Sequence, residues 1–169
     1  MKYMLLEDLK MELKAATLRD VEQLHSLELE GFPLDEAATM EGIRMRIEKA
    51  GDFFWLGEKH GTTVGFVNGT LTVGDFLSHE SMSSHNAAGE TLCIHSVCIR
   101  KDLQRQGLGT ALLSKYVEQI RANQQVKTVL LLCKPNLINF YERAGFYLVG
   151  PSDVVHGKDK WMEMKLALR

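Results

Sequence analysis

The sequence predicts a single domain of the mixed α/β class, and three observations carry that prediction. The chain has 169 residues, which is close to the length of one domain, and no stretch rich in Gly, Ser or Pro divides it. Apolar residues make up 45% and charged residues 25%, an ordinary globular composition. Apolar side chains recur with period two in some segments and with helical period in others, in the order β-α-α-β-β-β-α-β-α-β-β.

The N-terminal half is expected to hold two amphipathic helices among its strands. Thr17 is a candidate N-cap of the first helix, because its hydroxyl can accept from the first helical turn. Asp35 and Glu36 suit the start of the second helix, whose positive end attracts carboxylates, and Gly51 suits its C-terminus. The expected elements are a strand over 11–15, a helix after Thr17, a loop at 31–33, a helix over 35–51, and strands over 53–57 and 64–73 joined by a turn at 59–61.

The C-terminal half follows a polar, weakly patterned stretch over residues 78–90, which we expect to be a mobile loop. A helix is expected from near Gly107, because Leu112, Tyr116 and Ile120 recur at helical spacing. The other expected elements are strands over 91–99, 126–133, 146–149 and 161–166 and a short helix over 136–143.

The formal net charge is −2, which argues against a nucleic-acid binder held by phosphate contacts. The charge is unevenly divided, because the first 99 residues carry a net −8 and the last 70 a net +6. The basic part is therefore a candidate for meeting an anion, and the acidic part for meeting a cation. An uneven but solvated surface is the alternative.

The chain carries no evident targeting or membrane segment. Its longest dense apolar run, Val129 to Cys133, is far too short to span a bilayer. Glu7 and Asp8 interrupt the first ten residues, where a secretory peptide needs an unbroken apolar stretch. We therefore expect a cytoplasmic protein with no membrane partner. The three cysteines, Cys93, Cys98 and Cys133, lie in apolar runs and are expected to be buried reduced thiols.

A glycine-containing segment between a strand and a helix is the candidate anion site. Residues 104–109 read Gln-Arg-Gln-Gly-Leu-Gly. Their two glycines let a ligand approach the backbone, and the free N–H groups of the following helix suit a pyrophosphate. The dinucleotide fingerprint would need a third glycine at Leu112, and a P-loop would need Gly-Lys-Ser/Thr. Both patterns are absent, and a plain tight turn remains the alternative.

This segment, followed by Asn-Phe-Tyr-Glu-Arg-Ala-Gly-Phe at residues 139–146, resembles the GNAT superfamily of acetyl-CoA-dependent N-acetyltransferases. Residues 77–81, 94–97 and 140–143 are similar to those of the arylalkylamine (serotonin) N-acetyltransferases and their fungal polyamine-acetylating relatives. The resemblance covers nearly the whole chain and implies the GNAT fold, a mixed sheet of about seven strands flanked by about four helices.

The same resemblance implies an acetyl-CoA site. Val97, Cys98 and Ile99 would bind pantetheine through their backbone in the manner of an added strand. The pyrophosphate would lie on the glycine segment, whose residues are Gln104, Arg105, Gln106, Gly107, Leu108, Gly109 and Thr110.

Acetylating an amine requires a base for the ammonium, whose pKa is near ~10, and an acid for the departing thiolate, whose pKa is near ~8.5. By resemblance, His95 is the base and Tyr141 the acid. The family has another histidine two residues before the one that matches His95, and in this chain that earlier position is Cys93. A regular strand would put Cys93, His95 and Val97 on one face and direct Cys98 away from it.

That departure leaves the identity of a second basic group open. Glu28 or Glu30 could supply it, although both are expected to be ordinary solvated helix residues. A ping-pong route through a cysteine lacks an activating base other than His95. A metal site at His79, His85, Cys93 and His95 has no recognised ligand spacing, so we expect no metal.

The acceptor is expected to be a small amine. Phe32, Pro33 and Leu34 could wall an apolar slot, and Trp161 matches a family position that contacts substrate. The substrate-binding residues are then Glu28, Phe32, Pro33 and Trp161, with Glu30, Asp35 and Glu36 attracting a cation. For Asp35 and Glu36, stabilisation of a helix N-terminus is the alternative.

The expected function is direct transfer of acetyl to an arylalkylamine or polyamine, with backbone N–H groups near Val97 stabilising the oxyanion. A non-catalytic acyl-CoA sensor and a protein N-acetyltransferase are the alternatives. Residues 1–16 and those after Gly157 contain no Ser or Thr, so we expect no phospho-dependent partner.

Overall fold

The structure is a computed structural model that describes residues 10–169, with the exception of the side chain of His79. The predictions for residues 1–9 therefore lie outside the described residues. The strands are β1 (Glu12–Ala15), β2 (Phe54–Lys59), β3 (Thr62–Thr72), β4 (Thr91–Ile99), β5 (Thr128–Cys133), β6 (Tyr147–Pro151) and β7 (Met162–Ala167). The α-helices are α2 (Val21–Gly31), α3 (Met40–Ala50), α4 (His79–Ser83), α5 (Leu108–Arg121) and α6 (Ile138–Arg143).

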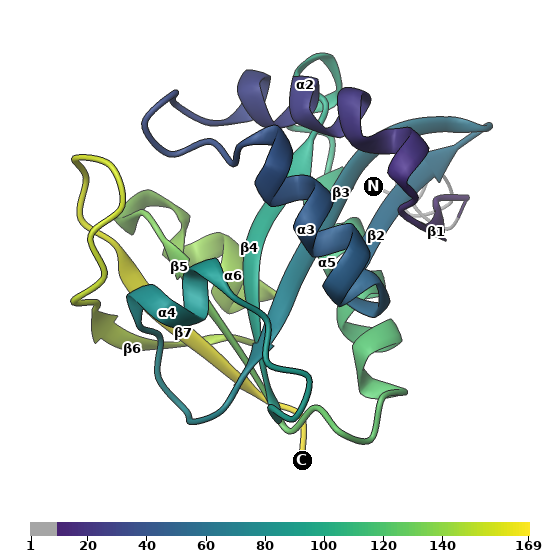
Figure 1. Cartoon of the computed structure of the whole chain (residues 1–169). Coiled ribbons are helices and arrows are strands. Elements are labelled where there is room, and N and C mark those ends of the chain that lie inside the picture. The colour runs from purple at the N-terminus through teal and green to yellow at the C-terminus, as the bar shows by residue number, and fades with distance from the viewer. Residues whose placement is uncertain (1–9) are drawn as a thin grey trace.

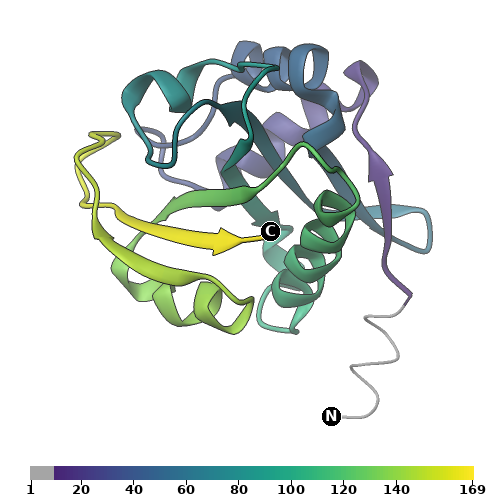
Figure 2. The ribbon, with the colours of Figure 1, turned by 90° about the horizontal axis from the view of Figure 1, so that it is seen from below.

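The described strands form one seven-stranded sheet in the order β1-β2-β3-β4-β5-β7-β6. The pair β4 and β5 is parallel, and the other neighbouring pairs are antiparallel. Helices α2, α3 and α4 cover one face of the sheet, and α5 and α6 cover the other (Figures 1 and 2). The predicted mixed α/β fold is confirmed. The predicted elements occur in the predicted order, and the structure adds the short helix α4 between β3 and β4.

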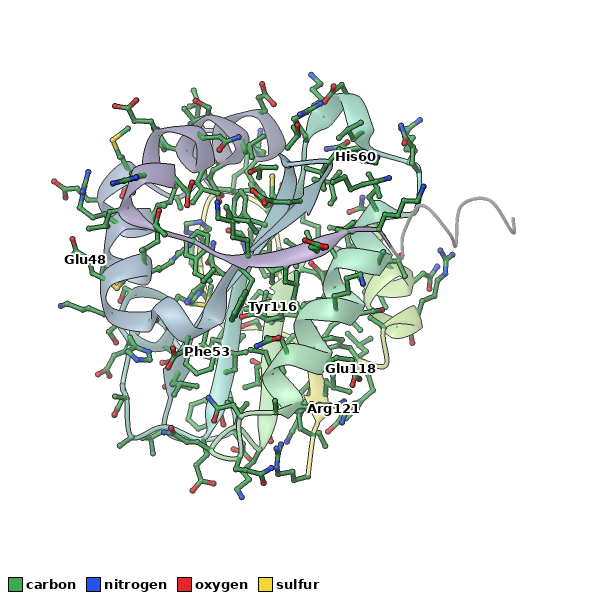
Figure 3. All side chains as sticks on the ribbon, turned by 90° about the vertical axis from the view of Figure 1, so that its right-hand side faces the viewer. Glu48, Phe53, His60, Tyr116, Glu118 and Arg121 are labelled. Atoms are coloured by element: carbon green, nitrogen blue, oxygen red, sulfur yellow. The ribbon has the colours of Figure 1, made fainter. Side chains whose placement is uncertain are left out.

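The larger core cluster lies between the sheet and α5. The apolar face of α5 buries Leu112, Tyr116 and Ile120 completely or nearly so, as the helical spacing of these residues predicts. The phenol hydroxyl of Tyr116 donates to the carbonyl oxygen of Phe53 at 2.7 Å, and Figure 3 shows the two residues side by side. This bond satisfies a polar atom inside the core and ties α5 to the start of β2.

The opposite face of the sheet packs against α2 and α3. Leu24, Ile43 and Phe66 are fully buried in this second cluster. Helix α3 begins at Met40, because the Thr39 hydroxyl accepts from the backbone N–H of Gly42 at 3.0 Å. The prediction that Asp35 and Glu36 open this helix is therefore wrong. A Thr N-cap supplies the acceptor that the first-turn N–H groups require, and residues 33–38 are free to form a loop.

Part of the predicted polar loop is helical. Ser78 and Ser81 cap the short helix α4 reciprocally, with the N–H of each bonded to the hydroxyl of the other at 2.8 and 3.2 Å. The turn expected at residues 59–61 is present, with positive φ at His60 and Gly61 (53° and 75°). It joins β2 to β3 at the end of the sheet that is distant from Phe53 (Figure 3).

A β-bulge at His95 changes which faces the residues of β4 occupy. Asn68 of β3 pairs with Ser96, but the next residue, Gly69, pairs with Ile94, so His95 is an extra residue. The bulge shifts the alternation of side chains by one. Val97 consequently packs in the same cluster as Ile94. The prediction that Cys93, His95 and Val97 share one face is wrong for Val97, because regular alternation stops at the bulge.

Candidate functional site

The sheet splits between β4 and β5. The two strands pair only from Thr91 to Ile94 and from Thr128 to Leu131, whereas β5 stays paired with β7 up to Cys133. Beyond this point a cavity of about 330 Å³ opens between the strands, and its walls include residues 94–97 of β4 and 131–133 of β5. The split gives side chains from both faces of the sheet access to one space.

His95 reaches this cavity from the bulge in β4. Its Nε2 lies 2.7 Å from the hydroxyl of Thr70 on β3. Among the described residues, nothing bonds its buried Nδ1. Burial, and after it electrostatic interactions with Arg46 and His156, hold the pKa of the imidazole well below its usual value. The ring is therefore neutral at pH 7 and can accept a proton.

Tyr141 reaches the same cavity from α6. Its ring is buried and makes edge contacts with Phe140 and Phe146, at centroid distances of 4.9 and 5.9 Å. Burial, with a smaller contribution from Cys133, raises the pKa of the phenol above its usual value. The hydroxyl therefore stays protonated at neutral pH and can act only as a proton donor there.

Glu28 on α2 is a buried carboxylate in the cavity wall, with 2% of its surface exposed. Its Oε1 accepts from the hydroxyl of Ser96 at 2.9 Å, and its Oε2 accepts from the N–H of Ala38 at 3.3 Å. The prediction that Glu28 is solvated is wrong, because α2 turns this side toward β4. Glu30, two residues later, is exposed, so of the two glutamates only Glu28 lines the cavity.

Arg46 on α3 also lines the cavity, and the sequence reasoning did not identify it. Its Nη1 donates to Oδ1 of Asn68 at 3.1 Å. Burial lowers the pKa of the guanidinium, while the negative charge of Glu28 opposes that shift. A signal was present in the sequence, because Arg46 stands among the core-facing Ile43, Ile47 and Ala50 of an amphipathic helix. A charge at such a position usually has a buried partner.

A second, more open groove of about 590 Å³ lies beside the first cavity. It is lined by most of the predicted cofactor residues, namely Val97, Cys98, Ile99, Gln104, Arg105, Gly107, Gly109 and Thr110. Two predicted members do not line it, because the side chain of Leu108 is buried in the core and Gln106 points to solvent. Arg143 of α6 lines the groove and was missed.

The glycine segment has the backbone of an anion-binding loop. Arg105 and Gly107 both have positive φ, 64° and 81°. Gly107 is the N-cap of α5, and no side chain caps the first turn of this helix. The amide of Gln104 donates to the carbonyl of Ile99 at 3.2 Å and holds the segment against the end of β4. The open N–H groups and the helix dipole together favour a negative ligand.

The two spaces meet at the split in the sheet. Four residues line both of them, namely Phe32, Val97, Leu137 and Tyr141. A ligand in the groove and a ligand in the cavity would therefore contact each other beside Tyr141.

The residues predicted to bind the acceptor are only partly brought together. Glu28, Phe32 and Trp161 line the cavity, whereas Pro33 is exposed and outside its wall. Leu34 is 85% exposed, so the expected apolar wall is formed by Phe32 alone. Residues 33–38 form a loop rather than the start of α3, and this conformation turns Leu34 to solvent.

The cysteines are free and buried, as predicted. Burial raises the pKa of Cys93 and of Cys98 to about 12, so neither thiol ionises at neutral pH. The thiol of Cys98 donates to the carbonyl of Leu27 on α2 at 3.4 Å. It therefore faces α2, as Ser96 does, and the prediction that Cys98 points away from the His95 face is wrong because of the bulge.

No group of three or more His, Cys, Asp or Glu side chains that could share a metal ion occurs among the described residues. Within residues 10–169, no helix is long and apolar enough to cross a membrane.

A mixed sheet that splits between two parallel strands, with a glycine-containing helix N-terminus at the split, defines the GNAT class of proteins. The Acetyltransferase (GNAT) family matches residues 18–146, so the chain belongs to this family.

Serotonin N-acetyltransferases are among its relatives. The chain is 33% identical to that of Mesocricetus auratus and 31% identical to that of Homo sapiens, each over 111 residues. Each alignment covers 66% of this chain and 54% of the relative, so the matched segment spans about half the length of these relatives.

Solved structures share the fold at low identity. The loading GNATL domain of CurA from Lyngbya majuscula has a TM-score of 0.84 at 17% identity, covering 94% of this chain and 98% of that domain. Arabidopsis thaliana Naa50, in complex with a bisubstrate analogue of CoA and a peptide, has a TM-score of 0.71 at 16% identity over 94% and 99% of the two chains.

Proposed function

We propose that this acetyltransferase transfers acetyl from acetyl-CoA to the primary amine of a small arylalkylamine or polyamine, by direct attack in a ternary complex. The observation that carries the proposal is the meeting of two spaces at Tyr141, one with an anion-binding loop and the other with a neutral imidazole. The similarity to serotonin N-acetyltransferases supports the choice of a small amine.

Acetyl-CoA would occupy the groove as the co-substrate. On one side, residues 97–99 pair with β3. On the other side, β5 has already diverged, so backbone N–H and C=O groups of β4 face the groove. An extended pantetheine arm carries amides that can bond to such an open strand edge, as an added strand does. Its pyrophosphate would lie on the first turn of α5, near Arg105 and Thr110.

The amine would occupy the cavity. Its nitrogen attacks the acetyl carbonyl carbon, so that a C–N bond forms and the C–S bond breaks. Backbone N–H groups near Val97 stabilise the negative charge on the carbonyl oxygen. The proton from the nitrogen passes to the neutral His95, directly or through a water, with the carboxylate of Glu28 nearby. Tyr141 gives its proton to the departing thiolate.

A panel of amines tests this function. Mixing the protein and acetyl-CoA with tryptamine, putrescine or spermidine should release free CoA thiol with at least one of them. The N-acetyl product should appear in equal amount by mass spectrometry. A protein that binds acetyl-CoA but releases no thiol with any amine would favour the sensor. Transfer to peptide N-termini alone would favour a protein N-acetyltransferase.

The conformation of Gly107 gives a separate test of the groove. Gly107→Ala places a Cβ on a residue with φ 81°, which costs roughly 1–2 kcal/mol and should displace the loop. We expect the Kd for CoA to rise about 10-fold, as measured by calorimetry. Gly61→Ala is the matched control, because Gly61 also has positive φ (75°) and no neighbour within 4 Å. Equal weakening in both variants would refute the role of the loop.

A further inference from the structure

Two loops from distant parts of the sequence form the outer wall of the acceptor cavity. We refer to residues 33–38, between α2 and α3, and residues 152–161, between β6 and β7, as the roof. Glu36, Ala38, Val154, His156 and Trp161 of the roof line the cavity. Figure 1 shows both loops projecting on the same side of the molecule.

The two loops are bonded to each other. Nε2 of His156 lies 2.8 Å from the carbonyl oxygen of Glu36, and the N–H of Lys158 donates to Oδ2 of Asp35 at 3.3 Å. They also approach closely at Gly157, where a Cβ would lie 2.9 Å from atoms of both Asp35 and Glu36. The roof is therefore a packed contact between the two loops.

One side chain from a third segment joins both loops. Lys134, which directly follows β5, places its Nζ 2.9 Å from Oε2 of Glu36 and 3.0 Å from Oδ2 of Asp159. The same Nζ lies 5.9 Å from the centroid of the Trp161 ring, within cation–π range. Lys134 thus contacts residues 33–38 through one partner and residues 152–161 through two.

The burial of Glu36 makes this junction structurally important. The Glu36 side chain is 2% exposed, whereas that of Asp159 is 46% exposed. Removing the ammonium would leave a buried carboxylate without its cation, which is strongly unfavourable. The exposed pair with Asp159 alone would contribute little. Loss of Lys134 should therefore release residues 33–38, which carry Glu36, from their position in the roof.

We propose that Lys134 is a specificity-determining residue that closes the roof over the acceptor cavity, so that a small amine is admitted and a polypeptide N-terminus is excluded. The role rests on the proposed function. The cavity of about 330 Å³ is near the lower end of the range for small-molecule pockets. A polypeptide acceptor is larger than this space, and it would need the two loops of the roof to separate where Lys134 joins Glu36 to Asp159.

Lys134→Met tests the proposal, because it keeps an unbranched apolar side chain beside Trp161 and removes the charge. We expect amide hydrogen exchange in residues 33–38 and 152–161 to accelerate at least 10-fold. The Kd of the CoA-bound protein for the best small amine should rise about 10-fold or more, with the Kd for CoA unchanged. Binding of a pentapeptide with a free N-terminus should become measurable.

Two further variants control for charge and for folding. Lys14→Met removes a lysine that pairs with Glu58 at 3.9 Å on strands β1 and β2. It should leave the amide exchange of the roof, the Kd for the amine and the Kd for CoA at their wild-type values, and it should not allow the pentapeptide to bind. The double variant Lys134→Met with Glu36→Gln removes the buried charge together with its cation. It should recover part of the exchange protection that the single variant loses.

The outcomes separate this inference from the proposed function. Unchanged exchange and unchanged amine affinity in Lys134→Met would overturn the role of Lys134. If the wild-type protein binds small amines more tightly than the variant does, yet neither protein transfers acetyl, the role of Lys134 stands and the proposed function fails.

Discussion

Replacing Tyr141 with phenylalanine is expected to lower kcat about 100-fold or more while leaving the Kd for acetyl-CoA unchanged. A positioned general acid contributes roughly 10²–10⁴-fold, and Tyr141 is the buried phenol that lines both the groove and the cavity. Phenylalanine keeps the edge contacts with Phe140 and Phe146, so packing should survive. Steady-state kinetics and calorimetry measure the two quantities.

The pKa of Tyr141 adds a pH signature to this prediction. Because burial raises the pKa of the phenol above its usual value of 10, the donor stays protonated throughout the neutral and mildly alkaline range. Wild-type kcat should therefore show no loss from this group between pH 7 and about pH 9.5. Tyr147→Phe on edge strand β6 is the control, since Tyr147 is 52% exposed and does not line the groove. A Tyr141→Phe variant with wild-type kcat would remove the tyrosine from the mechanism.

Replacing His95 with glutamine should lower kcat/KM by roughly 10²–10³-fold, if the imidazole is the base. Because its pKa lies well below 6.5, the ring loses its accepting form only as the pH falls well below 6.5. The acid limb of wild-type kcat should therefore lie below the usual imidazole pKa, and it should disappear in His95→Gln. An acid limb that the variant retains would assign it to another group.

Glu28→Gln tests whether His95 and Glu28 act as one unit. The amide keeps an oxygen for the Ser96 hydroxyl or the Ala38 N–H but removes the negative charge. If the two residues serve one proton transfer, the double variant should be little slower than His95→Gln alone, because members of a unit are non-additive. Glu30→Gln, on the exposed side of α2, is the control. Fully additive losses would show that the two groups act independently.

The secondary structure was largely predictable, because its signals are local. The apolar spacing on α5 and the turn at His60 and Gly61 are carried by adjacent residues, and both appear where expected. Helix α3 begins several residues after the predicted start, because the hydroxyl of Thr39, and neither of the two carboxylates before it, caps the first turn. A strand bulge leaves no such local signal, and regular alternation was therefore assumed through His95.

The part of the candidate site that is built from the end of β4 and the glycine segment was predictable from the sequence. His95 and Tyr141 were singled out from resemblance, and the structure brings both to one cavity. Arg46 and Lys134 were missed because their partners, Asn68 and Glu36, lie 22 and 98 positions away in the sequence. The spacing of residues along the chain carries no information about such pairs.

Sequence patterns alone were sufficient to predict the mixed α/β fold, the succession of its strands and longer helices, and the start of a helix at the glycine segment. Each of these depends on periodicity and on backbone freedom within a few residues. Three features of the site follow from the assembled fold instead: a bulge directs His95 and Ser96, Glu28 is buried, and Lys134 joins two loops. Burial and charge pairing are properties of the assembled surfaces, because they depend on which distant segments exclude water from one another.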